Sequence, residues 1–101
     1  MILYNVTVNI EDDVHNEWLE WMKNEHIPEV METGFFKEFK FLRIISRQPD
    51  ETGMTYSIQY FAANYDDYHE YAQNHAPRLQ EKTRQKFDGK FVAFRTLLET
   101  L

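Results

Sequence analysis

WLEWMKNEHIPEV, at residues 18–30, recurs about fifty residues later as YHEYAQNHAPRL, at residues 68–79. Each stretch carries an aromatic pair, then a His-x-Pro triplet, then an aliphatic residue. The matching members are Trp18, Trp21, His26, Pro28 and Val30 in the first stretch and Tyr68, Tyr71, His75, Pro77 and Leu79 in the second. The offset is 50 for the aromatic pair and 49 for the triplet, so the second copy is one residue shorter. Such self-similarity predicts two copies of one supersecondary unit.

Four strands are predicted around the two copies. Side chains at 2–10 alternate between apolar and polar, which is the pattern of a strand with one apolar face. Residues 54–62 alternate in the same way, residues 35–47 carry apolar side chains on both faces, and residues 90–99 form the last strand. The turn-forming residues at 48–53 predict the loop between the second and third strands.

Two helices are predicted between these strands. Asp12 or Asp13 supplies the N-cap of the first helix, and Asn64 or Asp66 caps the second. Proline kinks a helix interior, so we expect each helix to bend at the proline of its His-x-Pro triplet. Gly34 is expected to stop the first helix.

The predicted order is therefore βαββαβ. Two right-handed crossovers in tandem pack two kinked helices on one face of a four-stranded antiparallel sheet. The fold class is thus α+β, of the ferredoxin-like architecture. At this length, residues 1–101 are expected to form one domain.

Composition excludes several classes of function. The formal net charge of -6 opposes nucleic-acid binding, because attraction to phosphates needs a basic surface. No cysteine is present, which excludes disulfides and thiolate chemistry. No apolar run approaches the ~20 residues of a membrane span. We therefore expect a cytoplasmic protein without a membrane or nucleic-acid partner.

The sheet face away from the helices is expected to form a homodimer. A large apolar patch on a soluble protein usually marks an interaction surface, and two such sheets packed together would make a dimeric α+β barrel. The polar side chains assigned to this face are Asn5, Thr7, Asn9, Thr55, Ser57, Gln59 and Arg95. The apolar ones are Leu3, Phe39, Phe41, Phe61, Phe91 and Leu97.

The paired histidines allow two interpretations. His26 and His75 each stand two residues before a helix-breaking proline, where an imidazole can bond to backbone groups freed by the kink. On this structural interpretation the triplet is a duplicated device for kinking helices. On the functional interpretation, one histidine is a general base or a haem-iron ligand. The spacing predicts no metal site.

Arg95 is the strongest single candidate for a ligand-orienting residue. An inward-facing arginine is costly unless it meets a carboxylate or an anionic ligand. Its side chain is also long enough for the guanidinium to reach the rim of the dimeric barrel, where it would contact water. Together with Asn5, Thr7 and Gln59, it predicts a site for a small ligand in the sheet cavity, with no cofactor.

Four segments resemble a small bacterial family of unknown function: MILYNVTVNI, EHIPEV followed by Gly34, HAPRL, and KFVAFRTLLE. The resemblance covers the whole chain and implies a branch of the dimeric α+β barrel superfamily. It supplies a fold and no catalytic residue. More distantly, the architecture is similar to cofactor-independent monooxygenases, muconolactone-isomerase-like enzymes and haem-degrading enzymes, a likeness of fold alone.

Two functions are compatible with these observations. The first is a homodimeric ligand-binding or interaction domain without an established activity. The second is a monooxygenase- or isomerase-type enzyme acting on a small acidic or aromatic substrate, with His26 or His75 as general base and Arg95 orienting the substrate. A concave pocket with a desolvated histidine near Arg95 would favour the enzyme. An interface filled by phenylalanines would favour a structural role.

Overall fold

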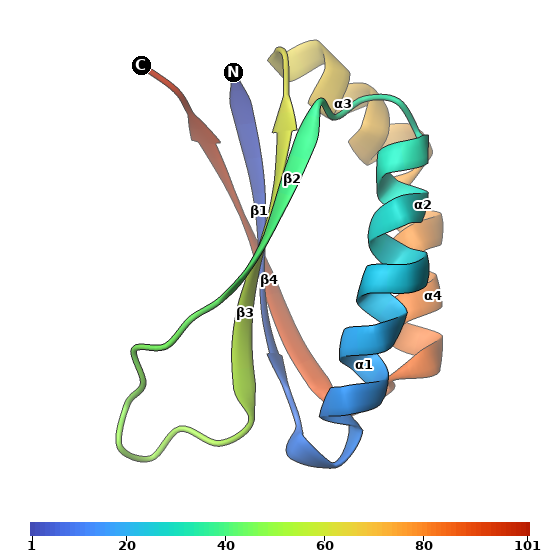
Figure 1. The fold of residues 1–101 in the computed structure, drawn as a ribbon. Helices are drawn as coiled ribbons and strands as arrows, with labels where there is room; N and C mark the ends of the chain where they lie inside the picture. Colours follow the sequence, from blue (N-terminus) through green and yellow to red (C-terminus); the bar gives the residue numbers. More distant parts are fainter.

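The computed structural model describes all 101 residues, and its elements follow the predicted order (Figure 1). They are β1 (Ile2–Ile10), the 3-10 turn η1 (Asp12–Val14), α1 (His15–Trp21), the π-helical turn η2 (Met22–His26), α2 (Ile27–Glu32), β2 (Glu38–Arg43), β3 (Met54–Ala62), α3 (Tyr65–Asn74), α4 (Ala76–Lys86) and β4 (Phe91–Glu99). Gly34 follows α2 with a φ of 85°, a left-handed conformation that favours glycine.

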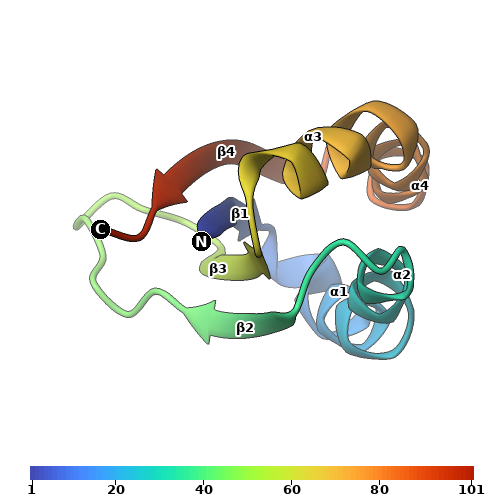
Figure 2. The same ribbon diagram turned by 90° about the horizontal axis from the view of Figure 1, so that it is seen from above.

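The four strands form one antiparallel sheet in the order β2-β3-β1-β4. All helices cover the same face of this sheet, while the other face is open (Figure 2). This arrangement confirms the predicted ferredoxin-like α+β fold. β2 is shorter than the predicted strand at 35–47, because residues 35–37 and 44–47 lie outside it.

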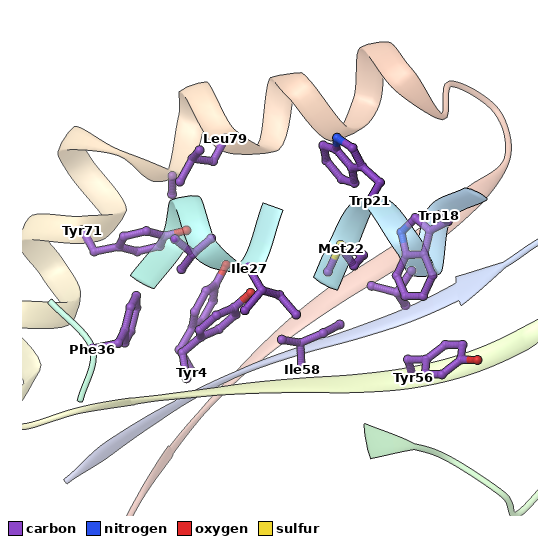
Figure 3. Close-up of a cluster of buried hydrophobic side chains, with 14 of the residues drawn as sticks. Tyr4, Trp18, Trp21, Met22, Ile27, Phe36, Tyr56, Ile58, Tyr71 and Leu79 are labelled. Carbon is purple, nitrogen blue, oxygen red and sulfur yellow. The ribbon is translucent and has the colours of Figure 1, made fainter. Parts of the chain in front are cut away.

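The hydrophobic core lies between the sheet and the helices. Trp18 of α1 and Leu79 of α4 lie on the helix side of this layer and Ile58 of β3 on the sheet side, and each is 1% exposed (Figure 3). Aromatic rings supply much of this layer. Tyr4 lies within 6.1 Å of the rings of Phe36, Tyr60, Tyr68 and Tyr71. Aromatic pairs of this kind add to the stabilisation from buried area.

The helical backbone around the His-x-Pro triplet differs between the two copies of the repeat. In the first, the Ile27 N–H donates to the Met22 carbonyl five residues earlier, so the helix continues through one wide π turn. A π turn holds one more residue than an α turn. The extra residue of the first copy is therefore absorbed here, and Trp21 and Ile27 both stay buried.

The second copy breaks where the first continues. His75 has a φ of -128° and a ψ of -38°, and it separates α3 from α4. Its N–H still donates to the Tyr71 carbonyl four residues earlier, at 2.9 Å. Kinking at both triplets was predicted. The structure has a break at His75 and a wide turn ending at His26.

Strand pairing corrects the predicted faces of the two edge strands. Arg95 pairs with Val6, and Phe91 pairs with Ile10, whose side chain is fully buried under the helices. The expectation that Arg95 lies on the open face is therefore wrong. The same correction applies to Phe39, Phe41, Phe91 and Leu97.

The open face carries mainly polar side chains on the two central strands, mainly apolar ones along β4, and two charged residues with one leucine along β2. The central strands contribute Leu3, Asn5, Thr7, Asn9, Thr55, Ser57, Gln59 and Phe61, as predicted. The edge strands contribute Glu38, Lys40, Leu42, Val92, Phe94, Thr96 and Leu98.

Candidate functional site

A cavity of about 40 Å³ lies between the sheet and the helices, on the face opposite to the predicted one. Its walls are side chains of β1, β3 and β4 on one side and of the helical segments on the other. Most of them are hydrophobic. The exceptions are one histidine, one arginine, a few tyrosine hydroxyls, and the side chains of Gln80 and Thr83.

His26 reaches this cavity from the end of η2. Its ring stacks on Trp21 with centroids 4.9 Å apart. Burial lowers the pKa of His26 from 6.5 to about 4, partly opposed by the Glu29 carboxylate, so the imidazole is neutral at pH 7. No fully buried polar side-chain atom lacks a partner. His26 forms no hydrogen bond, so its ring nitrogens are not fully buried and remain accessible to water or a ligand.

Two tyrosine hydroxyls also meet the cavity without a protein partner. Tyr60 and Tyr71 are only 2% and 3% exposed, and both line the cavity. Figure 3 shows the Tyr71 hydroxyl directed toward the space above Tyr4. Burial raises the pKa of both tyrosines, so their hydroxyls stay protonated and can donate hydrogen bonds.

Arg95 stands where the cavity opens. It lines the inner cavity and also an outer groove of about 430 Å³ between α4 and β4. Its Nε donates to the Tyr4 hydroxyl at 3.2 Å, and it takes part in none of the ion pairs. The guanidinium is thus held by one bond from Nε, and its terminal nitrogens have no protein partner.

The predicted ligand site is not assembled as one cluster. Asn5 and Gln59 lie on the open face, where the Ser57 hydroxyl donates to Asn5 Oδ1 and the Gln59 amide donates to Ser57. The Asn5 amide also donates to the Thr7 hydroxyl at 3.0 Å. The sheet separates this network from Arg95. A ligand-binding role for Asn5, Thr7 and Gln59 stays a prediction.

His75 does not share the cavity with His26. Its ring lies against Phe35 and Tyr71, with centroids 5.6 and 6.4 Å away, and its Nδ1 lies 3.4 Å from the Arg78 guanidinium. Of Tyr68, Tyr71 and His75 in the second copy of the repeat, only Tyr71 lines the cavity. The roles of Tyr4 and Tyr60 were missed, although their alternation with polar residues placed both on the helix-covered face.

No group of three or more histidine, aspartate or glutamate side chains is placed to hold a metal ion. None of the helices combines the length and the hydrophobicity that crossing a membrane requires.

Solved structures share this fold across the whole chain. An ethyl tert-butyl ether d (EthD) family protein from Bacillus halodurans is 15% identical with a TM-score of 0.73, covering 100% of both chains. HapK from Hahella chejuensis is 13% identical with a TM-score of 0.70, covering 100% of this chain and 93% of its own. A variant of MhuD with two manganese protoporphyrin IX molecules bound per active site is 13% identical with a TM-score of 0.66, covering 100% and 95%. At these identities the likeness shows the fold alone.

The search of curated proteins finds no match. A family model does match, and it spans residues 1–101. Its description is a domain of unknown function, which agrees with the resemblance inferred from the sequence. The chain therefore belongs to the DUF4286 family.

Proposed function

We propose that this protein binds a small molecule in the cavity between the sheet and the helices. The observation that carries the proposal is the set of polar groups on His26, Tyr60 and Tyr71, which lie in an apolar layer without protein partners. Because no fully buried polar atom lacks a partner, these groups remain accessible to water or to a ligand, either of which can form hydrogen bonds with them. A bound molecule with complementary groups would satisfy them.

Solved structures of the same fold support the proposal of ligand binding. The volume of the cavity limits the size of the ligand. The MhuD variant holds two manganese protoporphyrin IX molecules in each active site. The present cavity, at about 40 Å³, holds only a few water-sized groups, whereas a benzene-binding cavity measures about 150 Å³. The proposed ligand therefore places only a small polar group inside.

Binding can be tested by amide NMR spectra recorded with acetamide, phenol and 3-phenylpropanoate as probes. We expect shifts at residues that line the cavity. Ala93→Leu should abolish them because the larger side chain fills the cavity from β4. Ala63→Leu, at an exposed position beyond β3, is the matched control and should keep them. Shifts that persist in Ala93→Leu, or that no probe produces, would refute the proposal.

We also propose that two copies associate through the open sheet face. Val92, Phe94 and Leu98 of β4 are 70%, 60% and 49% exposed on this face, and Leu42 of β2 is 44% exposed at the other edge. Burying four large apolar side chains per copy would stabilise a dimer. The Asn5 network would then lie between the sheets, where the sequence-based ligand prediction places it.

An enzyme is the second candidate function, and the neutral imidazole of His26 favours it. Its ring nitrogens have no protein partner and can accept a proton, although a pKa of about 4 makes His26 a weak base at pH 7, and Arg95 could stabilise the anion that forms. No hydrogen bond joins the two side chains. Tautomerisation of phenylpyruvate, followed by its enol absorbance, tests this role. The general-base role of His26 would be supported if the wild type and His75→Gln accelerate the reaction and His26→Gln does not. Equal rates in all three proteins would exclude this role.

A further inference from the structure

We propose that the ligand is a small carboxylic acid with an apolar body, which lies in the groove between α4 and β4 and presents its carboxylate to Arg95 at the entrance of the inner cavity. This inference rests on the proposed small-molecule binding. It adds the chemical class of the ligand and the side from which the ligand enters.

The relative size of the two spaces is the first argument. The inner cavity measures about 40 Å³ and the groove about 430 Å³. Gln80, Phe91, Ala93 and Arg95 line both, so the two spaces adjoin along these side chains. A ring or an alkyl chain fits the groove but not the inner cavity. A ligand of more than a few atoms therefore keeps its body in the groove.

The distribution of charge is the second argument. Arg95 is the one cationic side chain that lines the inner cavity, since His26 is neutral. The other arginine of the groove, Arg84, is engaged by the carboxylate of Glu81. Because the Arg95 bond to Tyr4 uses Nε, both terminal nitrogens stay available. Terminal guanidinium nitrogens bind a carboxylate, and such a bond is stronger than one between neutral groups.

The polarity of the remaining lining groups is the third argument. The protonated hydroxyls of Tyr60 and Tyr71 can donate to a carboxylate oxygen that turns inward, so the inner cavity offers donors where the head group would arrive. On the groove side, Phe91 and Ala93 offer apolar contact for the body. An acid with a hydrophobic tail matches both ends.

The test compares 3-phenylpropanoate with 3-phenylpropanamide, which has the same shape without the charge. We expect the wild type to bind the acid about tenfold more tightly than the amide, the size of effect that a charge-assisted hydrogen bond gives. Arg95→Gln should reduce this ratio to about one, and Arg95→Lys should give an intermediate ratio. Arg43→Gln, which removes an exposed arginine from the other edge strand, should leave the ratio unchanged. Thermal melting of each variant checks that the variant is folded.

The possible outcomes separate this inference from the proposed function. Equal binding of acid and amide by the wild type, with both blocked by Ala93→Leu, would overturn the carboxylate inference and leave cavity binding intact. A preference for the acid that survives Arg95→Gln would also overturn it. Binding of neither probe at the cavity would overturn both proposals.

Discussion

The imidazole of His26 stacks on the indole of Trp21, with centroids 4.9 Å apart, although five residues separate them in sequence. In the second copy, His75 stacks on Tyr71 across four residues, with centroids 6.4 Å apart. In a regular α-helix, residues five apart point in different directions, whereas residues four apart are neighbours. The π turn of η2 thus restores in the first copy the stacking that the second obtains from ordinary spacing.

Deleting Asn24 from η2 should therefore be tolerated better than deleting Gln73 from α3. Both residues are exposed and lie between the aromatic residue and the histidine of their copy. Loss of Asn24 gives the first copy the spacing of the second, so Ile27 and Val30 still face the core. Loss of Gln73 turns the following residues by about 100° and takes Leu79 out of the core. Thermal melting should show a folded Asn24 deletion and an unfolded Gln73 deletion, and the reverse order would contradict this account.

His26 should make the protein less stable in weak acid. The folded-state pKa of about 4 lies below the ordinary 6.5, so between these values the unfolded chain binds more protons. The free energy of unfolding should fall as the pH drops from 6.5 to 4, and this one group contributes roughly 3 kcal/mol. Urea unfolding at several pH values measures the effect.

His26→Gln should remove that part of the pH dependence, because its amide does not titrate. His75→Gln, at the equivalent place outside the cavity, is the matched control and should keep the wild-type dependence on pH. If the slopes of wild type and His26→Gln agree between pH 6.5 and 4, the histidine is not desolvated as described. Direct NMR titration of the ring protons gives an independent reading.

Gly53→Ala should destabilise the protein more than Gly34→Ala. Both glycines have a positive φ, 73° and 85°, which alone costs an alanine about 1 kcal/mol. At Gly53 an added Cβ would also lie 2.6 Å from the Ile10 carbonyl oxygen, while nothing lies within 4 Å at Gly34. We expect a loss of about 1 kcal/mol for Gly34→Ala and several kcal/mol for Gly53→Ala, measured by urea unfolding. Equal losses would show that the loop moves away freely.

Phe94→Glu should dissociate the proposed dimer. This side chain is 60% exposed near the middle of β4 on the open face, and a buried carboxylate there would be strongly unfavourable. Leu97→Glu changes the same strand on the other face and should leave the association state unchanged. Sedimentation at micromolar concentration distinguishes the two. A monomeric wild type would rule the dimer out.

The order of elements could be predicted because the repeat and the alternation of β1 and β3 are both clear. Asn64 also caps α3 as expected, accepting from the Asp67 N–H at 2.9 Å. Residues were assigned to the wrong face of the sheet where apolar and polar side chains do not alternate along the strand. Phe36 is buried in the core but precedes β2, so counting from it assigns Phe39 to the wrong side.

Arg95 was misplaced for a related reason. β4 carries apolar side chains on both faces, Phe91 and Ala93 on one and Val92 and Phe94 on the other, so its pattern does not select a face. Only the pairing with β1 decides it. The cavity follows from the separation of helices and sheet, which no sequence pattern encodes. The one-residue offset between the copies was a visible signal of the π turn.

β4 is an edge strand, paired with β1 on one side only. Its free edge offers backbone N–H and C=O groups to any other extended chain, and its sequence FVAFRTLLE carries charge only at Arg95 and at its last residue. Charged side chains are a common protection against such edge-to-edge aggregation. Without Arg95, an unbroken uncharged run of eight residues would line this edge. Solubility is thus a second reason for an arginine at this position, independent of any ligand.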